Sequence, residues 1–321
     1  MKTTLKFGVV ALWAALGSTL AYAGNTGDNQ GAGDYRSIFG GHVWAHGATD
    51  CDTSHAASYQ AHQVDDQTYI LRQNKCQSFE ASFVYLLLGE NQSLVVDTGA
   101  KVPRREQSLA DHVQKILNRH GREGQKLLVL HSHGHSDHTA GDQALKKRKN
   151  TQIIRGKSKA LKKFFKDADA NGEIKIDLGG RQITAFRIPG HQEESIALYD
   201  THTKWLLTGD TLYPGMIMIK NWDEFKSSIN RLYDFSQKHQ VSAIMGGHIE
   251  RKSAPGDYYD IGSTYQPDEA PLDLPVSVIA TVRDYLNSTD KAQAKDLGWL
   301  KLQPMNGLQK GLSSIFRAFS G

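Results

Sequence analysis

The chain has 321 residues, of which 39% are hydrophobic, 22% charged and 9% aromatic, and its formal net charge is +4. This composition is typical of a globular protein with its own core, and beyond the first residues no apolar run is long enough to span a bilayer. The near balance of charges does not by itself indicate a polyanionic partner.

The first 23 residues have the pattern of a secretory signal peptide. Lys2 and Lys6 precede an apolar run at 7–20, and the Ala-Tyr-Ala that follows predicts cleavage before Gly24. We therefore expect an exported protein, periplasmic or secreted, with no stable membrane insertion after cleavage. An uncleaved anchor is the alternative, and the shortness of the apolar run disfavours it.

The mature N-terminus is predicted to be a flexible leader over residues 24–60, because its first part, GNTGDNQGAGD, is polar and rich in glycine. Cys51 and Cys76 both lie in the mature chain. An even pair of cysteines in an oxidising compartment favours a disulfide, and two separate buried thiols are the alternative. The sequence leaves the pairing open.

Strand-like and helix-like segments alternate in the first half of the remaining chain. SFVYLLLG (82–89) and SLVVDTG (93–99) are predicted to form a hairpin. The apolar spacing over 104–121 predicts a helix that stops at Gly121. KLLVLHS (126–132) has the pattern of a buried strand, and it runs straight into a cluster of histidines.

The second half repeats this alternation. Residues 172–191 are predicted as a hairpin that turns at Gly179-Gly180, and SIALYD and KWLLTGD as further strands. Residues 223–239 have the apolar spacing of an amphipathic helix, and VSAIMGG follows as a strand. Strand pairs and strand–helix units in both halves favour an α/β sandwich of two sheets with helices outside.

We assign residues 61–275 to this domain and residues 276–321 to a C-terminal helical extension. PVSVIATVRDYLNS is expected to be a helix. The end of the chain carries an apolar stripe, which is expected to dock on the core rather than on a membrane. The stripe consists of Leu308, Leu312, Ile315 and Phe319. The sequence does not indicate the role of the extension.

The histidine cluster HSHGHSDHTAGD (131–142) offers metal ligands. Imidazole and carboxylate groups are ligands that zinc and iron(II) accept. At a strand end, His133 and His135 can point the same way because alternate residues share a side. Asp137 and His138, on the turn into a helix, can then face a second position. One loop therefore offers two groups of ligands.

Three further donors follow apolar runs elsewhere in the chain, each beside a glycine: His191 in IPGH, Asp210 in LLTGD and His248 in IMGGH. Glycine lets the backbone approach a ligand closely. Any one of them alone is commonly a hydrogen-bonded turn or core residue. Their similar placement favours a shared metal site.

These motifs resemble the metallo-β-lactamase-fold superfamily, with likeness to its glyoxalase II, lactonase and β-lactamase branches. The matching elements occur in the family's order: VVDTG (95–99), HGHSDHTAG (133–141), PGH (189–191), TGD (208–210) and GH (247–248). The resemblance covers roughly residues 80–250. It implies a four-layer αββα sandwich of two mixed β-sheets with outer helices.

The resemblance also implies a role for each candidate ligand. The first metal would be held by His133, His135 and His191, and the second by Asp137, His138 and His248, with Asp210 bridging both. Asp97 would support the ligand loop without binding metal, and His131 falls outside the set. No ligand position is substituted, which implies two metals. These are expected to be Zn²⁺, although iron or manganese also accept such ligands.

The expected reaction is hydrolysis by a hydroxide that bridges two zinc ions, because zinc-bound water loses a proton near neutral pH. Asp137 is predicted to orient this hydroxide. Tyr213 is predicted to donate to a substrate carbonyl or leaving oxygen, and a tyrosine packed at the pocket edge is the alternative. The expected substrate is a small-molecule ester, lactone or thioester. A β-lactamase, a mononuclear iron sulfur dioxygenase and a non-catalytic metal-binding protein are the alternatives, and the oligomeric state stays open.

Three weaker patterns favour ordinary structure. DADANGEIKIDL (167–178) resembles a calcium loop, but Leu178 stands where the bidentate glutamate belongs, so we predict a hairpin turn. The basic runs 146–149 and 157–167 are expected to be a solvated face, and we predict no nucleic-acid partner. The histidines near Cys51 are expected to be loop residues rather than an extra metal site; these are His42, His46 and His55.

Overall fold

The structure is a computed structural model, and it describes residues 31–102 and 107–310. The predicted signal peptide, the start of the predicted leader and most of the C-terminal apolar stripe lie outside these residues. In the part of the chain that is described, no helix is both long enough and apolar enough to cross a membrane.

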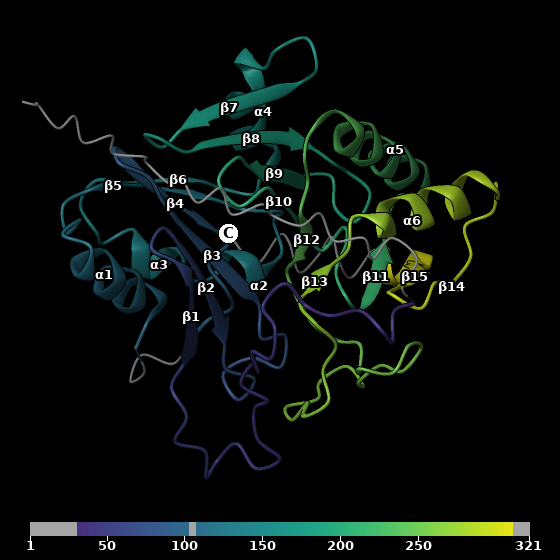
Figure 1. The fold of residues 1–321 in the computed structure, drawn as a ribbon, viewed down its shortest axis with the longest axis horizontal. Helices are drawn as coiled ribbons and strands as arrows, with labels where there is room; N and C mark the ends of the chain where they lie inside the picture. The colour runs from purple at the N-terminus through teal and green to yellow at the C-terminus, as the bar shows by residue number, and fades with distance from the viewer. Residues whose placement is uncertain (1–30, 103–106, 311–321) are drawn as a thin grey trace, which may run out of the picture.

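Two six-stranded sheets form the body of the protein (Figure 1). The first sheet has the order β1 (Tyr59–Asp65), β2 (Thr68–Gln73), β3 (Phe83–Leu88), β4 (Gln92–Val96), β5 (Lys126–Leu130) and β6 (Thr151–Ile154). The second has the order β13 (Asp273–Leu274), β12 (Ala243–Gly246), β10 (Trp205–Gly209), β9 (Ile196–Asp200), β8 (Gln182–Arg187) and β7 (Glu173–Asp177). Both sheets are mixed, because β4, β5 and β6 run parallel in the first and β10 and β12 in the second, while the other neighbours are antiparallel.

Helices cover the outer faces of the two sheets. The covering helices are α1 (Leu109–Arg119), α5 (Trp222–Lys238) and α6 (Ser277–Asn287). Shorter helices lie in the connections between strands: α2 (Ser136–Thr139), α3 (Asp142–Leu145), α4 (Ser158–Phe164) and the 3₁₀ helix η1 (Phe165–Asp167). One apolar cluster packs α1 on the first sheet and another packs α5 and α6 on the second. A third cluster lies between the sheets. The predicted four-layer sandwich with outer helices is confirmed.

Strand β3 shows how the sequence buries a central strand. Phe83, Tyr85 and Leu87 belong to the cluster between the sheets, and Val84, Leu86 and Leu88 belong to the cluster under α1. Successive side chains of a strand point to opposite faces. A strand that is covered on both faces therefore needs an unbroken apolar run, which FVYLLL provides.

The predicted hairpins and helices are present. β3 pairs with β4 and β7 pairs with β8, both antiparallel. The β7–β8 turn uses Gly179 and Gly180 at positive φ (85° and 69°), a conformation that glycine adopts without strain. Helix α1 begins with a capping box between Ser108 and Asp111 and ends before Gly121, whose φ is also positive.

The C-terminal extension differs from the helical segment that the sequence predicted. It contains α6, but the chain then returns as β14 (Lys295–Asp296) and β15 (Lys301–Pro304). β15 pairs in parallel with β11 (Met216–Ile219), which forms a small third sheet. Leu300 and Leu302 are buried in the cluster under α5 and α6. The extension therefore completes one outer layer of the domain.

The segment predicted as a flexible leader packs against the domain from residue 31 onward. The Asp273 carboxylate, which is buried, accepts hydrogen bonds from the Tyr35 hydroxyl (2.6 Å), the Ser37 hydroxyl (2.5 Å) and the Ile38 amide (3.0 Å). Trp44 is buried between the sheets. These contacts explain why a segment with little regular structure is held in place, and the domain boundaries stay predictions.

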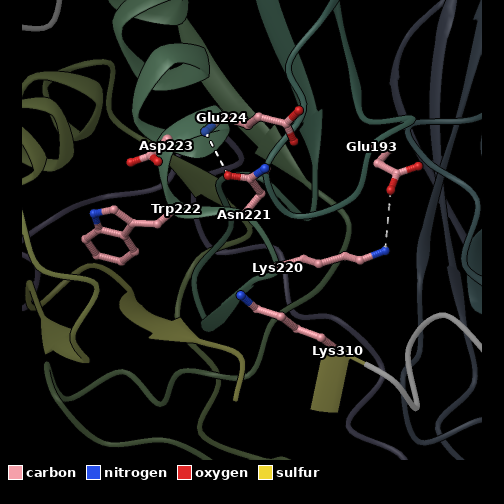
Figure 2. Close-up of a pocket in the computed structure, with 8 residues that line it drawn as sticks. Glu193, Lys220, Asn221, Trp222, Asp223, Glu224 and Lys310 are labelled. Carbon is pink, nitrogen blue, oxygen red and sulfur yellow. Dashed lines mark hydrogen bonds and ion pairs between the residues drawn. The ribbon is translucent and has the colours of Figure 1, made fainter. Parts of the chain in front are cut away.

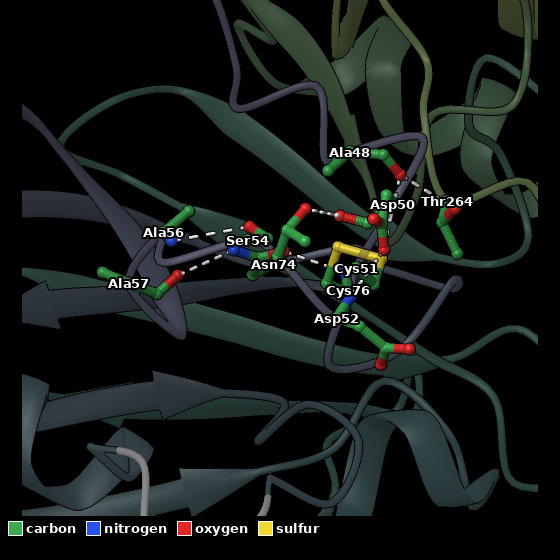
Figure 3. The surroundings of a disulfide bond; sticks show 11 residues. Ala48, Asp50, Cys51, Asp52, Ser54, Ala56, Ala57, Asn74, Cys76 and Thr264 are labelled. Carbon is green, nitrogen blue, oxygen red and sulfur yellow. Dashed lines mark hydrogen bonds between the residues drawn. A yellow bond between two sulfur atoms is a disulfide. The ribbon is translucent and has the colours of Figure 1, made fainter.

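Cys51 and Cys76 form a disulfide with a Cα–Cα distance of 5.2 Å. Figure 3 shows that it joins the loop around Ala48 to the turn that follows β2. Thr264 donates to the Ala48 carbonyl (3.0 Å), and Asn74 donates to the Ala57 carbonyl (3.0 Å). The crosslink thus anchors the N-terminal segment to the turn that follows β2.

Replacing both cysteines in Cys51→Ser/Cys76→Ser is expected to lower the free energy of unfolding by about 3.5 kcal/mol, the loop-closure value for a 25-residue separation. Urea unfolding of the oxidised protein and of the double variant measures this difference. An unchanged midpoint, with the bond verified in the parent by mass spectrometry, would contradict the prediction.

Candidate metal centre

The histidine loop starts at the carboxyl end of β5 and crosses into α2. A Cβ on Gly134 would lie 2.3 Å from the Gly156 carbonyl oxygen, so only glycine lets these two backbones pass so closely. The loop brings four predicted ligands to one end of the sheet, namely His133, His135, Asp137 and His138.

The remaining ligands follow three strands of the second sheet. His191 follows β8, Asp210 follows β10 and His248 follows β12. β8 and β10 run in the same direction because β9 pairs antiparallel with both, and β12 is parallel to β10. Their carboxyl ends therefore meet at one edge, next to the histidine loop.

All seven predicted ligands come together in two clusters that share one residue. The first cluster contains His133, His135, His191 and Asp210, and the second contains Asp137, His138, Asp210 and His248. Within each cluster the ligand atoms lie within 4.8 Å of one another. These are the two candidate metal sites in the described part of the chain.

Asp210 presents a different oxygen to each cluster. Its Oδ2 lies 3.6 Å from the Nε2 atoms of both His133 and His191. Its Oδ1 lies 3.3 Å from the Nε2 atoms of both His138 and His248. A carboxylate placed in this way can bridge two ions.

The distances between ligand atoms fit metal coordination. Four ligands at about 2.0–2.1 Å from zinc, arranged as a tetrahedron, lie about 3.3 Å apart. The Asp210 contacts of 3.3 Å and 3.6 Å are equal to or slightly longer than this value. His138 Nε2 lies slightly closer, 3.1 Å from Asp137 Oδ2. The spacing is therefore that of groups which surround a common centre.

The outer nitrogens of the histidines also fit metal binding. The Nδ1 atoms of His138, His191 and His248 face acceptors, which are Asp97 Oδ2 (2.8 Å), the Met218 carbonyl (2.7 Å) and the Glu80 carbonyl (2.9 Å). In a neutral ring this leaves Nε2 as a bare lone pair. The Nε2 atoms of His138 and His248 face each other at 3.1 Å, an arrangement that a cation between them stabilises.

Burial and charge set the protonation of these ligands. Burial lowers the pKa of His135 to about 3, and it holds the pKa of His133 well below the usual value. Burial acts in the same direction on His138 and His248, but the neighbouring carboxylates, Asp210 above all, outweigh it and raise the pKa of both rings well above the usual value. Metal must therefore displace protons at the second cluster, since it binds the neutral ring.

Asp97 supports the histidine loop, as the resemblance implied. Its Oδ1 accepts from the Ser132 amide (2.7 Å), and its Oδ2 accepts from the Ser132 hydroxyl (2.8 Å) and from His138 Nδ1. Asp97 has a φ of 62°, in the left-handed region that non-glycine residues seldom adopt. This strained backbone places both oxygens under the loop, which orients the ring of His138.

His131 lies outside both clusters, in agreement with its predicted exclusion from the ligand set. Its Nδ1 faces the Ile154 carbonyl at 2.9 Å, and its Nε2 faces Asp142 Oδ1 at 2.8 Å. Both ring nitrogens therefore have protein partners. His131 holds β6 and α3 to the start of the loop.

Asp97→Asn is expected to weaken metal binding at the second cluster by about 10- to 100-fold. The reason is that one of the two carboxylate oxygens becomes an amide NH₂ group, which cannot accept a hydrogen bond from Ser132 or His138. Zinc titration against a competing chelator measures both sites. The first cluster is the internal control, since Asp97 contacts no ring of that cluster other than through Ser132. Equal weakening of both sites would contradict the assignment.

Tyr213 is buried, with its ring centre 5.6 Å from that of His248. Its hydroxyl lies 2.7 Å from the Met216 carbonyl and 3.0 Å from Glu250 Oε2. Glu250 also accepts from the Met216 amide at 2.7 Å. The hydroxyl is thus engaged by protein groups, and its predicted role as a donor to substrate stays a prediction.

The sequence reading missed several polar neighbours of the ligands. The Gln192 amide contacts His135 Nε2, and the Ser82 hydroxyl lies 3.5 Å from Asp137 Oδ2. Glu80 approaches through its carbonyl, and Ala81 beside it has a positive φ of 45°. Of these neighbours, only Gln192 and Glu250 could have been found from the sequence, because each lies within two residues of a predicted ligand.

Two of the weaker patterns have ordinary roles. Asp169 Oδ1 accepts from the amides of Asn171 (2.8 Å) and Glu173 (3.0 Å), which forms the turn that leads into β7. Cys51 is in the disulfide and is unavailable to a metal. The segment 167–178 therefore contains a turn between η1 and β7, and not the predicted hairpin turn, because the β7–β8 hairpin turns at Gly179 and Gly180.

A cavity of about 540 Å³ is lined by no predicted ligand, but its lining includes Gly190, which directly precedes His191 in the chain. Figure 2 shows Lys220 and Lys310 extending across this cavity, with Trp222 at its other side. Lys220 lies 3.8 Å from Glu193. The cavity thus offers charged groups of both signs and one aromatic ring.

Comparison with known protein families shows which family the chain belongs to. The model of the metallo-beta-lactamase superfamily matches residues 78–280, which include every predicted ligand. The chain belongs to the metallo-beta-lactamase superfamily. Membership of the superfamily confirms the resemblance drawn from the motifs.

Several curated proteins are similar to this superfamily member, and all are named as hydrolases. An acyl-coenzyme A thioesterase of Gallus gallus is 24% identical over 219 residues, which cover 57% of this chain and 77% of the relative. A hydroxyacylglutathione hydrolase of Anaeromyxobacter dehalogenans is 29% identical over 135 residues, 41% of this chain and 46% of the relative. The prediction of a metal-dependent hydrolase of this superfamily is confirmed.

Solved structures of the superfamily are also similar to this chain. A metallo-beta-lactamase from Pontibacter korlensis has a TM-score of 0.47 at 12% identity and covers 72% of this chain and 100% of its own. A superfamily protein from Sulfolobus tokodaii has a TM-score of 0.45 at 15% identity and covers 78% of this chain and 94% of its own.

Proposed function

We propose that the protein is an exported dinuclear zinc hydrolase that cleaves a small ester, lactone or thioester. The observation that carries the proposal is Asp210, which offers one carboxylate oxygen to each of two three-ligand groups. In the proposed assignment, His133, His135 and His191 hold one ion, and Asp137, His138 and His248 hold the other. Zinc supplies, when bound, a water of low pKa and a Lewis acid for a carbonyl oxygen.

The residues around the ions would orient water and substrate. The side chain of Asp137 is 18% exposed, whereas that of Asp210 is 9% exposed. Asp137 is therefore the more accessible of the two carboxylates, and it can accept a hydrogen bond from the attacking water. No nucleophilic side chain is needed, because the water attacks the acyl carbon directly.

Thioesters are the preferred substrates within the proposed class. Both kinds of curated relative are named for thioester hydrolysis, as acyl-coenzyme A thioesterase and as hydroxyacylglutathione hydrolase. The cavity beside Gly190 could receive the polar part of such a substrate, since it contains Lys220 and Lys310 together with Trp222.

Export is part of the proposal because the first 23 residues have the pattern of a signal peptide. The disulfide between Cys51 and Cys76 agrees with it, since such bonds persist in oxidising compartments. Cell fractionation and the N-terminal sequence of the mature chain test the proposal, with Gly24 as the expected first residue.

The first experiment is elemental analysis of the purified chain together with a panel of thioesters, lactones, esters and cephalosporins. Two zinc ions per chain, with thioester hydrolysis that is lost on chelation and in Asp137→Ala, would support the proposal. One iron per chain with no hydrolysis, and oxygen uptake with persulfides, would replace it by a sulfur dioxygenase.

A further inference from the structure

The segment 146–166 concentrates positive charge in one stretch of the chain. It contains ten basic residues and no acidic one: Lys146, Lys147, Arg148, Lys149, Arg155, Lys157, Lys159, Lys162, Lys163 and Lys166. The rest of the chain has 28 basic and 34 acidic residues, a formal net charge of −6. The near balance of the whole chain therefore conceals a strongly basic segment, which we call the basic face.

The structure turns these charges outward. Eight of the ten are exposed, and Arg148 and Lys157 are half-buried. The apolar residues of the same segment point inward, because Leu161, Phe164 and Phe165 pack on the cluster between the sheets. Among the described residues, Lys166 is the one member of the basic face that forms an ion pair, with Asp167 at 3.5 Å, and both are exposed.

The basic face borders the candidate metal centre. β6 is the edge strand next to β5, and the chain leaves it at Arg155 (Figure 1). The Gly156 backbone packs against Gly134 of the histidine loop. At the start of α4, the Ser158 hydroxyl donates to Glu194 at 2.5 Å, three residues after His191. These two contacts hold the basic face beside the histidine loop and beside the loop that carries His191.

We propose that the basic face docks the protein on an anionic phospholipid bilayer, with the metal centre at the margin of the contact. Clusters of lysine and arginine residues on an amphipathic helix are typical of binding to anionic lipid, and α4 exposes Lys159, Lys162 and Lys163 while its apolar side packs on the core. The charges lie at both ends of β6, and four strand residues alone span about 13 Å. This extent suits an extended anionic surface better than a single bound anion.

The composition of the basic face favours lipid over nucleic acid. Eight of its residues are lysines, whose ammonium groups act as hydrated point charges, and two are arginines. Arg148 donates to the carbonyls of Glu123 (3.1 Å) and Gln125 (2.8 Å). Phe164 and Phe165 pack on the core, so they offer no platform on which bases could stack.

The test is co-sedimentation of the metal-loaded chain from residue 24 with vesicles. Vesicles of phosphatidylcholine alone are compared with vesicles that also contain phosphatidylglycerol. We expect binding to the anionic vesicles only, lost as salt rises from about 0.05 M to about 0.5 M. Equal binding to both kinds of vesicle, or binding to neither, would overturn the proposal.

Matched charge-reversal variants locate the contact. Lys159→Glu/Lys162→Glu/Lys163→Glu on α4 is expected to weaken binding to anionic vesicles on the order of 100-fold or more. The control carries the same change of charge at exposed lysines elsewhere, Lys238→Glu/Lys291→Glu/Lys295→Glu, and should bind like the parent. An equal loss of vesicle binding in both variants would show that net charge alone determines binding, and it would overturn the assignment of the contact to the basic face.

A second variant and a second ligand complete the test. Lys146→Glu/Lys147→Glu/Lys149→Glu changes the loop before β6 and repeats the measurement if the α4 variant does not fold. Binding of single-stranded DNA without binding of anionic vesicles would overturn the proposal in favour of a nucleic-acid partner. The readout is binding, so it does not depend on whether the proposed hydrolase activity is found.

Discussion

Asp210→Ala is expected to reduce hydrolysis by at least about 100-fold and to lower the metal content from two ions to at most one. Loss of a group that merely orients a ligand typically costs 10- to 100-fold, and Asp210 contacts both clusters directly. Its two oxygens lie 3.3–3.6 Å from four histidine Nε2 atoms. No other described residue belongs to both clusters.

The measurement is kcat/KM on the best thioester, paired with elemental analysis of the same sample. Asp142→Asn is the matched control, because Asp142 is also a buried carboxylate near the loop but faces His131 and Thr98 instead of a metal ligand. The control should keep two ions. An Asp210→Ala variant with two ions and normal activity would contradict the bridging assignment.

The ligands were predictable because each combines two local signals. Asp210 and His248 follow apolar runs that become central strands, and each lies beside a glycine. Gly247 shows the reason: a Cβ there would lie 2.5 Å from Asp210 Oδ1. The pattern of a strand followed by glycine and a donor therefore records the close packing that the metal centre requires.

Long-range pairings were not predictable from local patterns. β11 pairs with β15, which lies some way along the chain and has only four residues. Nothing in the local sequence of Lys301–Pro304 favours that partner over another edge. The Tyr213 hydroxyl is a similar case, since its partners depend on the turn that brings Met216 and Glu250 together.

The disulfide was predictable only in part. Cys51 and Cys76 could be identified as candidates, but pairing requires that the loop around Ala48 returns to the end of β2. That return depends on the packing of residues 31–58, which the composition of the leader did not indicate. Polar and glycine-rich sequence predicts little regular structure, and the structure shows that such a segment can still be anchored by a few buried contacts.

Removal of the metals is expected to abolish hydrolysis and to lower the melting temperature by about 8 to 16 °C. A ligand present at about 1,000 times its Kd stabilises the folded state by about 4.1 kcal/mol, and each kcal/mol corresponds to about 2–4 °C for a domain of this size. The structural reason is local: a cation would hold the buried carboxylate of Asp210 and the neutral rings of His138 and His248 around one point, and its removal takes those bonds away.

Differential scanning calorimetry before chelation, after chelation and after zinc is restored measures this effect. The Asp210→Ala variant is the control, because its bridging ligand is already absent and chelation should change its melting temperature much less. A chelator that acted on the protein surface would lower both melting temperatures equally, which would contradict the prediction. A large shift in the parent alone would show that the metals stabilise the fold through the residues that we propose as metal ligands, so that stability and activity depend on the same carboxylate.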